Sequence, residues 1–278
     1  MVKQYLFIAV NLLAHMGLTN TPKRTVTTAE TVFAIIDYLK NANGGEVGEI
    51  AAALGLAEST THTYLATLQE HEYVVKNETT YYLSLKPLDN GVTVRDNMAL
   101  THAARSVIGQ LAAETNEVSW IMVEEHGHGV YLMKREGAKA VQTRGQIGKR
   151  TTMHDIATGK AILAYLSEKR TEAIIEQFGL PERTENTITN PEAFREEMAQ
   201  IREQEYATNE GETMEKVRAL ASPIMYDQEV CGSVGIAGPK HRLNGERFTE
   251  DLPNVVLEAA DTIELNLTYP VGGDAGET

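Results

Sequence analysis

The stretch GEIAAALGLAESTTHTYLATLQEHEYV, from Gly48 to Val74, decides the fold of the first part of the chain. It contains two segments with helical apolar spacing, one from about Val47 to Leu54 and one from about Glu58 to Glu70. The turn between them is very short, and its Gly55 suits the left-handed conformation that ends many helices. Two helices joined so closely are typical of a helix-turn-helix unit.

The flanking residues predict the rest of a winged helix-turn-helix. Apolar residues spaced by three and four positions predict a first helix over 28–40, and Thr27 and Glu30 have the spacing of a capping box. After the third helix, the β-rich runs 73–75 and 81–83 surround a polar turn that begins at Lys76. This pattern predicts a β-hairpin, which would be the wing.

The third helix of such a unit enters the DNA major groove, so its outward residues are candidates for DNA contact. Hydroxyl and imidazole groups reach phosphates or base edges but select bases weakly. Two alternatives stay open: the first hydroxyls cap the helix and the histidine is an ordinary surface residue, or the module binds a protein. The candidate DNA-binding residues are Ser59, Thr60, His62 and Thr63 on the helix and Lys76 in the wing.

The segment after the wing predicts one helix from Val94 to about Ala113 with a partly apolar face. Just before it, Lys86-Pro87 and Asp89-Asn90-Gly91 predict a break in the structure. We interpret the helix as a linker between two domains. The alternative is a core helix of the second domain.

The remaining residues predict an α/β sheet with helices packed on it. Short β-rich runs at 119–124 and 130–135 are separated by a glycine-containing turn, which indicates a hairpin. A second hairpin is expected from 217–226 and 230–237. Helices are expected at 155–168, 170–178 and 191–205, with a closing helix over 250–267. The expected fold class is therefore α+β.

The charge balance is unusual for a DNA-binding protein. The chain holds 39 acidic and 25 basic residues, a formal net charge of −14, whereas nucleic-acid binders usually carry basic surfaces. In molar salt, however, the gain from releasing counterions at phosphates is small, because affinity falls with salt at a slope of about −0.9 per neutralised phosphate. We interpret the acidity as a sign of a halophilic source.

The N-terminal residues 1–15 contain a short apolar run over 5–13. This run is too short for the ~20 residues of a membrane helix, and Ala14-His15-Met16 offers no small-x-small cleavage site. We expect either a true start at Met16 or a short helix packed on a neighbour. With Cys231 as the single cysteine, no intramolecular disulfide can form, which fits the cytoplasm.

Several chemical motifs are incomplete. His126 and His128 lack a third metal ligand nearby. Gly159-Lys160 lacks the glycine and the Ser or Thr of a phosphate loop, and His154-Asp155 lacks a nucleophilic serine in a sharp turn. Cys231 lies in an apolar run without a base, as a buried thiol would. We therefore expect no enzyme activity, no cofactor and no metal.

Four segments together resemble the IclR family of transcriptional regulators. The stretch from Gly48 to Val74 is similar to the family's "ELA..LGL" and "STVYR.L.TL...GYV" motifs, and 153–161 resembles "HASG.GKA". Further on, 218–224 resembles "R.LAAPI" and 232–239 resembles "A.SISGP". The similarity extends from about Val26 to Tyr269 with the motifs in the family's order.

The resemblance implies a winged helix-turn-helix, a linker helix that supports dimerisation, and a GAF-like α/β domain that binds an effector. Such regulators bind palindromic operators in double-stranded DNA as dimers or dimers of dimers. The expected segments are an extension at 1–25, the DNA-binding domain at 26–88, the linker at 89–115, the effector domain at 116–269 and a flexible tail at 270–278. Membrane association is not expected.

This chain departs from the family pattern in the recognition segment. Glu58 stands where a basic residue is frequent, His62 where an aromatic is, and Thr63 where an arginine is. The loss of two cations weakens the contribution of phosphate contacts. This loss agrees with the acidic composition. The alternative therefore stays open that the chain is an architectural protein that binds DNA poorly and senses no ligand.

The resemblance also implies the effector site. A pocket of this kind is mostly apolar with a few placed polar groups, and a helix beginning at Ala157 offers N–H groups to a carboxylate. Fewer hydroxyls than in relatives that bind 2-oxo acids suggest a different, larger organic or sugar acid. The alternative is that these are ordinary core residues. The family's ligand positions correspond to Met153, Ala157, Thr158, Asn209, Ala219, Gly235 and Ala237, with Ile224 and Val234 as apolar lining.

Overall fold

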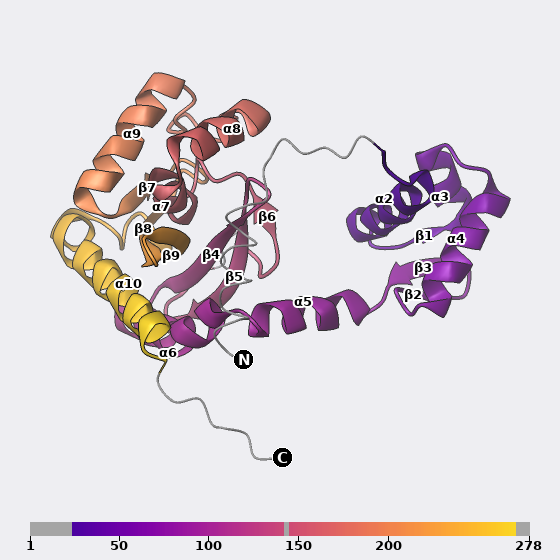
Figure 1. The fold of residues 1–278 in the computed structure, drawn as a ribbon, viewed down its shortest axis with the longest axis horizontal. Helices are drawn as coiled ribbons and strands as arrows, with labels where there is room; N and C mark the ends of the chain where they lie inside the picture. The colour runs from indigo at the N-terminus through magenta and orange to yellow at the C-terminus, as the bar shows by residue number, and fades with distance from the viewer. Residues whose placement is uncertain (1–23, 142–144, 271–278) are drawn as a thin grey trace, which may run out of the picture. The chain divides into compact units, whose positions relative to one another are not determined.

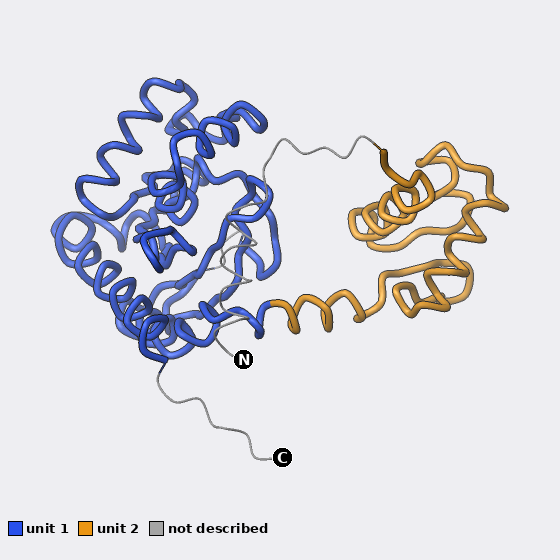
Figure 2. Tube along the Cα trace, in the orientation of Figure 1, with its two compact units in different colours: residues 1–19, 95–278 blue, residues 20–94 orange. Residues whose placement is uncertain are grey.

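The computed structural model describes residues 24–141 and 145–270 (Figure 1). These residues form two compact units, one that ends at Val94 and one that begins at Arg95 (Figure 2). Helices and antiparallel strands are both present in each unit, so the expected α+β class is confirmed. No helix in the described ranges is long and apolar enough to cross a membrane.

The first unit is a helix-turn-helix with a small three-stranded sheet. Its strand order is β1-β3-β2, and β2 and β3 form the hairpin expected as the wing. Asn43 and Gly55, both with positive φ, end the first two helices. The elements are α2 (Thr27–Ala42), β1 (Gly45–Glu46), α3 (Val47–Leu54), α4 (Glu58–Glu70), β2 (Val74–Asn77) and β3 (Thr80–Leu83).

The start of α2 differs from the capping box expected at Thr27. Val26 is the residue before the helix, and it makes no side-chain cap, while Thr27 is already helical. A capping box is present instead at α3, where Glu46 and Glu49 exchange side-chain and backbone hydrogen bonds. Glutamate replaces the more usual Ser or Thr there, which is why the spacing rule missed it.

The segment expected as one helix from Val94 forms two helices, and the expected break is itself helical. Helix α5 spans Lys86–Asp96 and α6 spans Ala99–Thr115. Proline is tolerated in the first turn of a helix, and Ser84 Oγ accepts the Lys86 N–H at 3.1 Å. The chain breaks at Met98, whose backbone is extended. Nine residues of α6 are buried, so α6 is a core helix of the second unit.

The second unit is built on a six-stranded antiparallel sheet of order β6-β5-β4-β9-β8-β7. The strands are β4 (Val118–Glu125), β5 (His128–Glu136), β6 (Arg150–Thr151), β7 (Ala207–Glu210), β8 (Val217–Tyr226) and β9 (Glu229–Pro239). The helices are α7 (Ala157–Tyr165), α8 (Glu168–Phe178), α9 (Pro191–Gln204) and α10 (Leu252–Thr268), the last preceded by a π-helical turn at Arg247–Asp251.

Helices cover both faces of this sheet. Helices α6 and α10 pack on one face and share a core with Ile121, Leu220 and Ile236. Helix α7 packs on the opposite face, where Met122 and Ala221 contribute to a second core (Figure 1). Neighbouring residues of a strand point to opposite faces, so the position of a residue along its strand decides which core it joins.

Candidate functional site

The candidate DNA-reading surface is the outer face of α4. Its inner face buries Thr61, Leu65 and Leu68 in the core of the first unit. Ala57 precedes the helix without a side-chain cap, so Ser59 and Thr60 do not cap it. All four candidate side chains on α4 are exposed: Ser59, Thr60, His62 and Thr63.

One of these hydroxyls is already engaged. Thr63 Oγ1 donates to the Ser59 carbonyl at 2.9 Å, so it faces solvent mainly as an acceptor. No hydrogen bond of the Ser59, Thr60 or His62 side chain is present among the described residues, which leaves these groups free to meet DNA. In the wing, exposed Lys76 places its Nζ 5.0 Å from the centre of the Tyr81 ring.

The electrostatics of this unit are acidic. Residues 24–83 contain three cations, Arg24, Lys40 and Lys76, against eight Asp and Glu residues. The only charged residues of α4 itself are Glu58 and Glu70. This surface therefore offers few cations for the neutralisation of phosphates.

The candidate effector site lies between α7 and a floor of small residues on the sheet. Trp120 pairs with Gly235, and Gly235 pairs with Ala221. In the next row, Ala237 pairs with Ala219. A Cβ on Gly235 would lie 3.0 Å from Thr158 Cγ2, so this side of the sheet faces α7.

The beginning of α7 supplies the polar end of the site. Met153, Ala157 and Thr158 are buried. Ile156 precedes the helix without a side-chain cap, and no acceptor for the N–H groups of Ala157 and Thr158 occurs among the described residues. A buried helix end needs partners for such groups, and an anion is the ligand that they and the helix dipole favour.

Asn209 lies next to this floor, because it pairs with Ala219, but its amide is fully engaged. Its Nδ2 donates to the Asp155 carbonyl and to Thr213 Oγ1, and its Oδ1 accepts the N–H groups of Gly211 and Glu212. An amide has two donors and two acceptor sites. Asn209 therefore shapes the wall of the site and holds the following loop against α7.

The structure does not bring Ile224 and Val234 to this site. Both side chains belong to the core under α6 and α10, on the opposite face of the sheet. Val234 precedes Gly235 by one residue, so strand geometry directs it away from α7. The other seven expected residues lie on the α7 side of the sheet or on the loop and helix that cover it.

Trp120 is a neighbour of the site that the sequence motifs did not indicate. Its ring lies 4.7 Å from the Tyr131 ring, tilted by 54°, and burial raises the pKa of Tyr131 to about 12. Its strand position, level with Gly235, is visible only once β4 is paired with β9. The aromatic pair forms an apolar boundary beside the small residues.

The other chemically suggestive residues are used structurally. The His128 ring packs edge-on against Phe178 at 4.4 Å, and no group of three metal-binding side chains occurs in 24–141 or 145–270. Burial raises the pKa of the Cys231 thiol to about 12, and its Sγ lies 3.3 Å from the Ile224 carbonyl. His154 Nε2 lies 3.0 Å from the Pro181 carbonyl oxygen.

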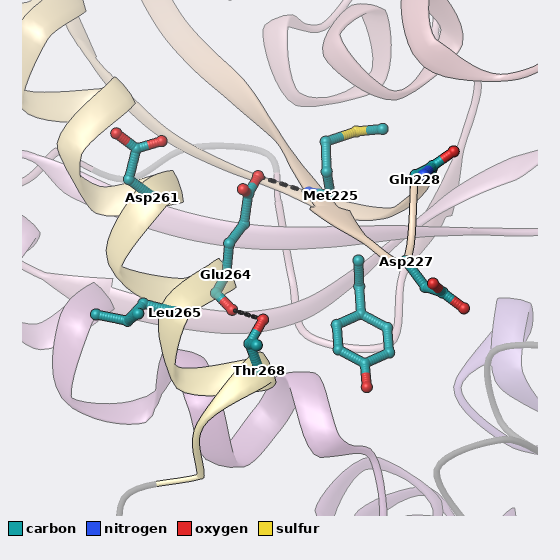
Figure 3. Close-up of a pocket in the computed structure, with 8 residues that line it drawn as sticks. Met225, Asp227, Gln228, Asp261, Glu264, Leu265 and Thr268 are labelled. Carbon is teal, nitrogen blue, oxygen red and sulfur yellow. Dashed lines mark hydrogen bonds between the residues drawn. The ribbon is translucent and has the colours of Figure 1, made fainter.

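A separate surface pocket of about 410 Å³ lies between the β8–β9 turn and α10 (Figure 3). Glu264 Oε1 accepts the Met225 N–H there at 2.7 Å, and burial raises the pKa of this carboxyl. Asp227 and Asp261 add two further carboxylates, and its eight described lining residues include no Lys or Arg. This charge does not complement a carboxylate ligand.

Comparisons with known families match both units. Residues 28–78 match the family model described as the IclR helix-turn-helix domain. Residues 92–265 match the model described as bacterial transcriptional regulator IclR C-terminal. The two matches follow each other in the order of the two units.

Two curated relatives are similar over almost their whole length. The probable HTH-type transcriptional regulator ArcR of Halobacterium salinarum is 32% identical, covering 89% of this chain and 96% of the relative. The HTH-type transcriptional regulator XynR of Escherichia coli is 30% identical, covering 88% and 98%.

Solved structures share the fold. The IclR of Thermotoga maritima aligns with a TM-score of 0.72 at 26% identity, covering 87% of this chain and 99% of that structure. An IclR homologue from Microbacterium hydrocarbonoxydans, complexed with 4-hydroxybenzoate, aligns with a TM-score of 0.75 at 20% identity, covering 87% and 99%.

Proposed function

The chain belongs to the IclR family of transcriptional regulators, and we propose that it binds an operator as a dimer under the control of an organic acid. It is a DNA-binding regulator with a ligand-binding C-terminal domain, and it is not an enzyme. The finer points of the proposal are the contact residues, the class of ligand, the dimer surface and the working conditions.

On the DNA side, we propose that Ser59, Thr60, His62 and Thr63 meet base edges and phosphates while Lys76 contacts the backbone from the wing. Their common exposure on one helix and its adjoining hairpin supports this assignment. The acidic charge of the unit favours work at high salt, where an acidic surface remains soluble and phosphate contacts contribute little. We place this activity in the cytoplasm of a halophile.

On the ligand side, the observation that carries the proposal is the buried, unpartnered start of α7 above a floor of small residues. The N–H groups of Ala157 and Thr158 receive the carboxylate, and Met153 packs beside it. Gly235 lets the start of α7 approach the sheet closely, Ala219 and Ala237 present only methyl groups to the body of the acid, and Trp120 favours a flat acid. A ligand changes operator binding only through its different affinity for the two states of the protein.

A thermal-shift screen of the full chain against aromatic acids, 2-oxo acids and sugar acids tests this site. Binding of one class raises the melting temperature, and Ala219→Leu abolishes that increase by filling the floor. Ala113→Leu, on the exposed side of α6, is the matched control and keeps the increase. If no acid stabilises the protein, the sensor proposal fails and an architectural role replaces it.

The dimer proposal rests on α5. Helix α5 buries none of its own residues in the described chain. Leu88 and Val94 on it, and Leu85 just before it, are 62%, 65% and 80% exposed. Exposed apolar side chains gathered on one element commonly mark an interaction surface, and a second copy of α5 would bury them. Sedimentation should show that Leu88→Glu dissociates the dimer, whereas Leu265→Glu, on α10, does not.

A further inference from the structure

The recognition helix α4 ends in a three-residue motif, His71-Glu72-Tyr73. The Tyr73 N–H donates to the Leu68 carbonyl at 2.8 Å, and the Glu72 N–H donates to the Gln69 carbonyl at 3.0 Å. This is the hydrogen-bond pattern of a Schellman ending. Glu72 occupies the left-handed position of that ending, with φ of 63°, where glycine is the usual residue.

The residues that lead into α5 hold the first part of this motif. Ser84 Oγ donates to the Glu72 carbonyl. Lys86 Nζ donates to the His71 carbonyl at 3.0 Å and lies 3.3 Å from the Glu72 carboxylate. A cation at the C-terminus of a helix also interacts favourably with the helix dipole. The strained residue is therefore fixed by two side chains from the start of the linker.

The first turns of α5 also hold Tyr73. Asn90 Nδ2 donates to the Tyr73 hydroxyl at 2.9 Å, and Lys86 Nζ lies 5.7 Å from the centre of the Tyr73 ring. Since α5 has no buried residue of its own, these polar contacts replace a hydrophobic core between the two helices. Non-glycine residues in the left-handed region persist where their surroundings hold them in place, and here those surroundings are the start of α5.

We propose that Ser84, Lys86 and Asn90 form a clamp that makes α4 and α5 move as one body. They are positioning residues for DNA recognition: a rotation of α5 is delivered to α4, and the candidate base-reading residues turn with it. Without the clamp, the linker can move while the recognition helix keeps its own orientation. Two of the three clamp residues are uncharged, so the clamp can be opened without changing the charge that DNA meets.

The first test measures the α4–α5 distance in the full chain by pulsed electron paramagnetic resonance. Spin labels are placed through Ala66→Cys and Thr93→Cys in a Cys231→Ser background, diluted with unlabelled chain. We expect one narrow distance distribution, which broadens in Ser84→Ala/Asn90→Ala because each lost hydrogen bond weakens clamp closure by about fivefold. Thr28→Ala/Asn41→Ala removes one hydroxyl and one amide from α2 and should leave the distribution narrow.

The second test measures DNA affinity, using a sequence selected by the wild-type chain from a random library. Ser84→Ala/Asn90→Ala should weaken binding to that sequence by about tenfold, while binding to random DNA stays unchanged because no charge is lost. If the double variant folds poorly, Tyr73→Phe replaces it in this test. That substitution removes only the acceptor of the Asn90 hydrogen bond and should weaken binding to the selected sequence by a smaller factor.

A distance distribution no broader than that of the α2 control would overturn the clamp, and so would an equal loss of affinity for selected and random DNA. The distance measurement needs no DNA. Failure to select a DNA sequence would therefore count against the proposed operator binding and leave the clamp to be decided by the distances.

Discussion

The ammonium group of Lys160 lies 2.7 Å from Glu212 Oε1, and only 1% of the Lys160 side chain is exposed. Glu197 Oε1 lies 2.7 Å from the same nitrogen. One buried cation thus faces two carboxylates, and Glu212 Oε2 has no hydrogen-bond partner among the described residues. This cluster connects α7, whose first turn lines the candidate effector site, to α9 and to the loop after β7. The Lys160 ammonium group is thus engaged by carboxylates.

Replacing Lys160 by methionine should destabilise the second unit by about 3–5 kcal/mol, because it leaves uncompensated carboxylates in the interior. Chemical denaturation measures the change. Arg195→Met, which removes a largely exposed ion pair with Glu172, should change stability by less than about 1 kcal/mol. Equal losses in the two variants would contradict the importance of burial.

Glu212 should make stability depend on pH in a defined direction. Burial raises its pKa from the ordinary value of 4.5, although Lys160 opposes the shift. The folded state then holds the proton more tightly than the unfolded state, so this contribution is present below about pH 4.5 and lost as pH rises through the folded pKa. Stability of Glu212→Gln should therefore increase relative to the wild type across that window. A difference in unfolding free energy between Glu212→Gln and the wild type that stays constant with pH would contradict this prediction. The control is Glu185→Gln, which changes an exposed carboxyl.

Gly159 should tolerate no side chain. A Cβ there would lie 2.6 Å from Met153 Cα and would also meet the Met153 carbonyl oxygen, so Gly159→Ala should displace the start of α7. We expect the free energy of unfolding to fall by about 1–3 kcal/mol. The acid should also no longer raise the melting temperature of this variant. Gly109 of α6 has open space around it, and Gly109→Ala should instead stabilise by up to about 1 kcal/mol. Urea denaturation of both variants checks the contrast.

Operator affinity should fall unusually gently as KCl increases. Few cations lie near the recognition surface, and each neutralised phosphate contributes about −0.9 to the slope of log affinity against log salt. Glu58→Lys should make the slope steeper by about one unit and strengthen binding to random DNA. Anisotropy titrations across KCl concentrations measure both slopes, and a steep wild-type slope would refute the argument.

The helix-turn-helix could be predicted closely because its signals are local. The apolar spacing and Gly55 predicted α3 and α4 at the residues where they occur. The wing followed from two β-rich runs around a polar turn. Local rules failed where a rarer residue fills a role, as at the Glu46 capping box and at the proline in the first turn of α5.

The sequence by itself determined the helix-turn-helix, the wing, the hairpins β4–β5 and β8–β9 and the family of this protein, since periodicity and motif order depend on neighbouring residues. It did not reveal the short strands β1, β6 and β7 or the division of the expected linker helix into α5 and α6. Only the tertiary structure decided which strand residues share a site. Gly235 and Val234 are adjacent, yet one faces α7 and the other the opposite core. Likewise, the partners of Lys160 lie 37 and 52 residues away along the chain. Strand pairing and long-range packing bring such groups together, and neither can be read from local spacing.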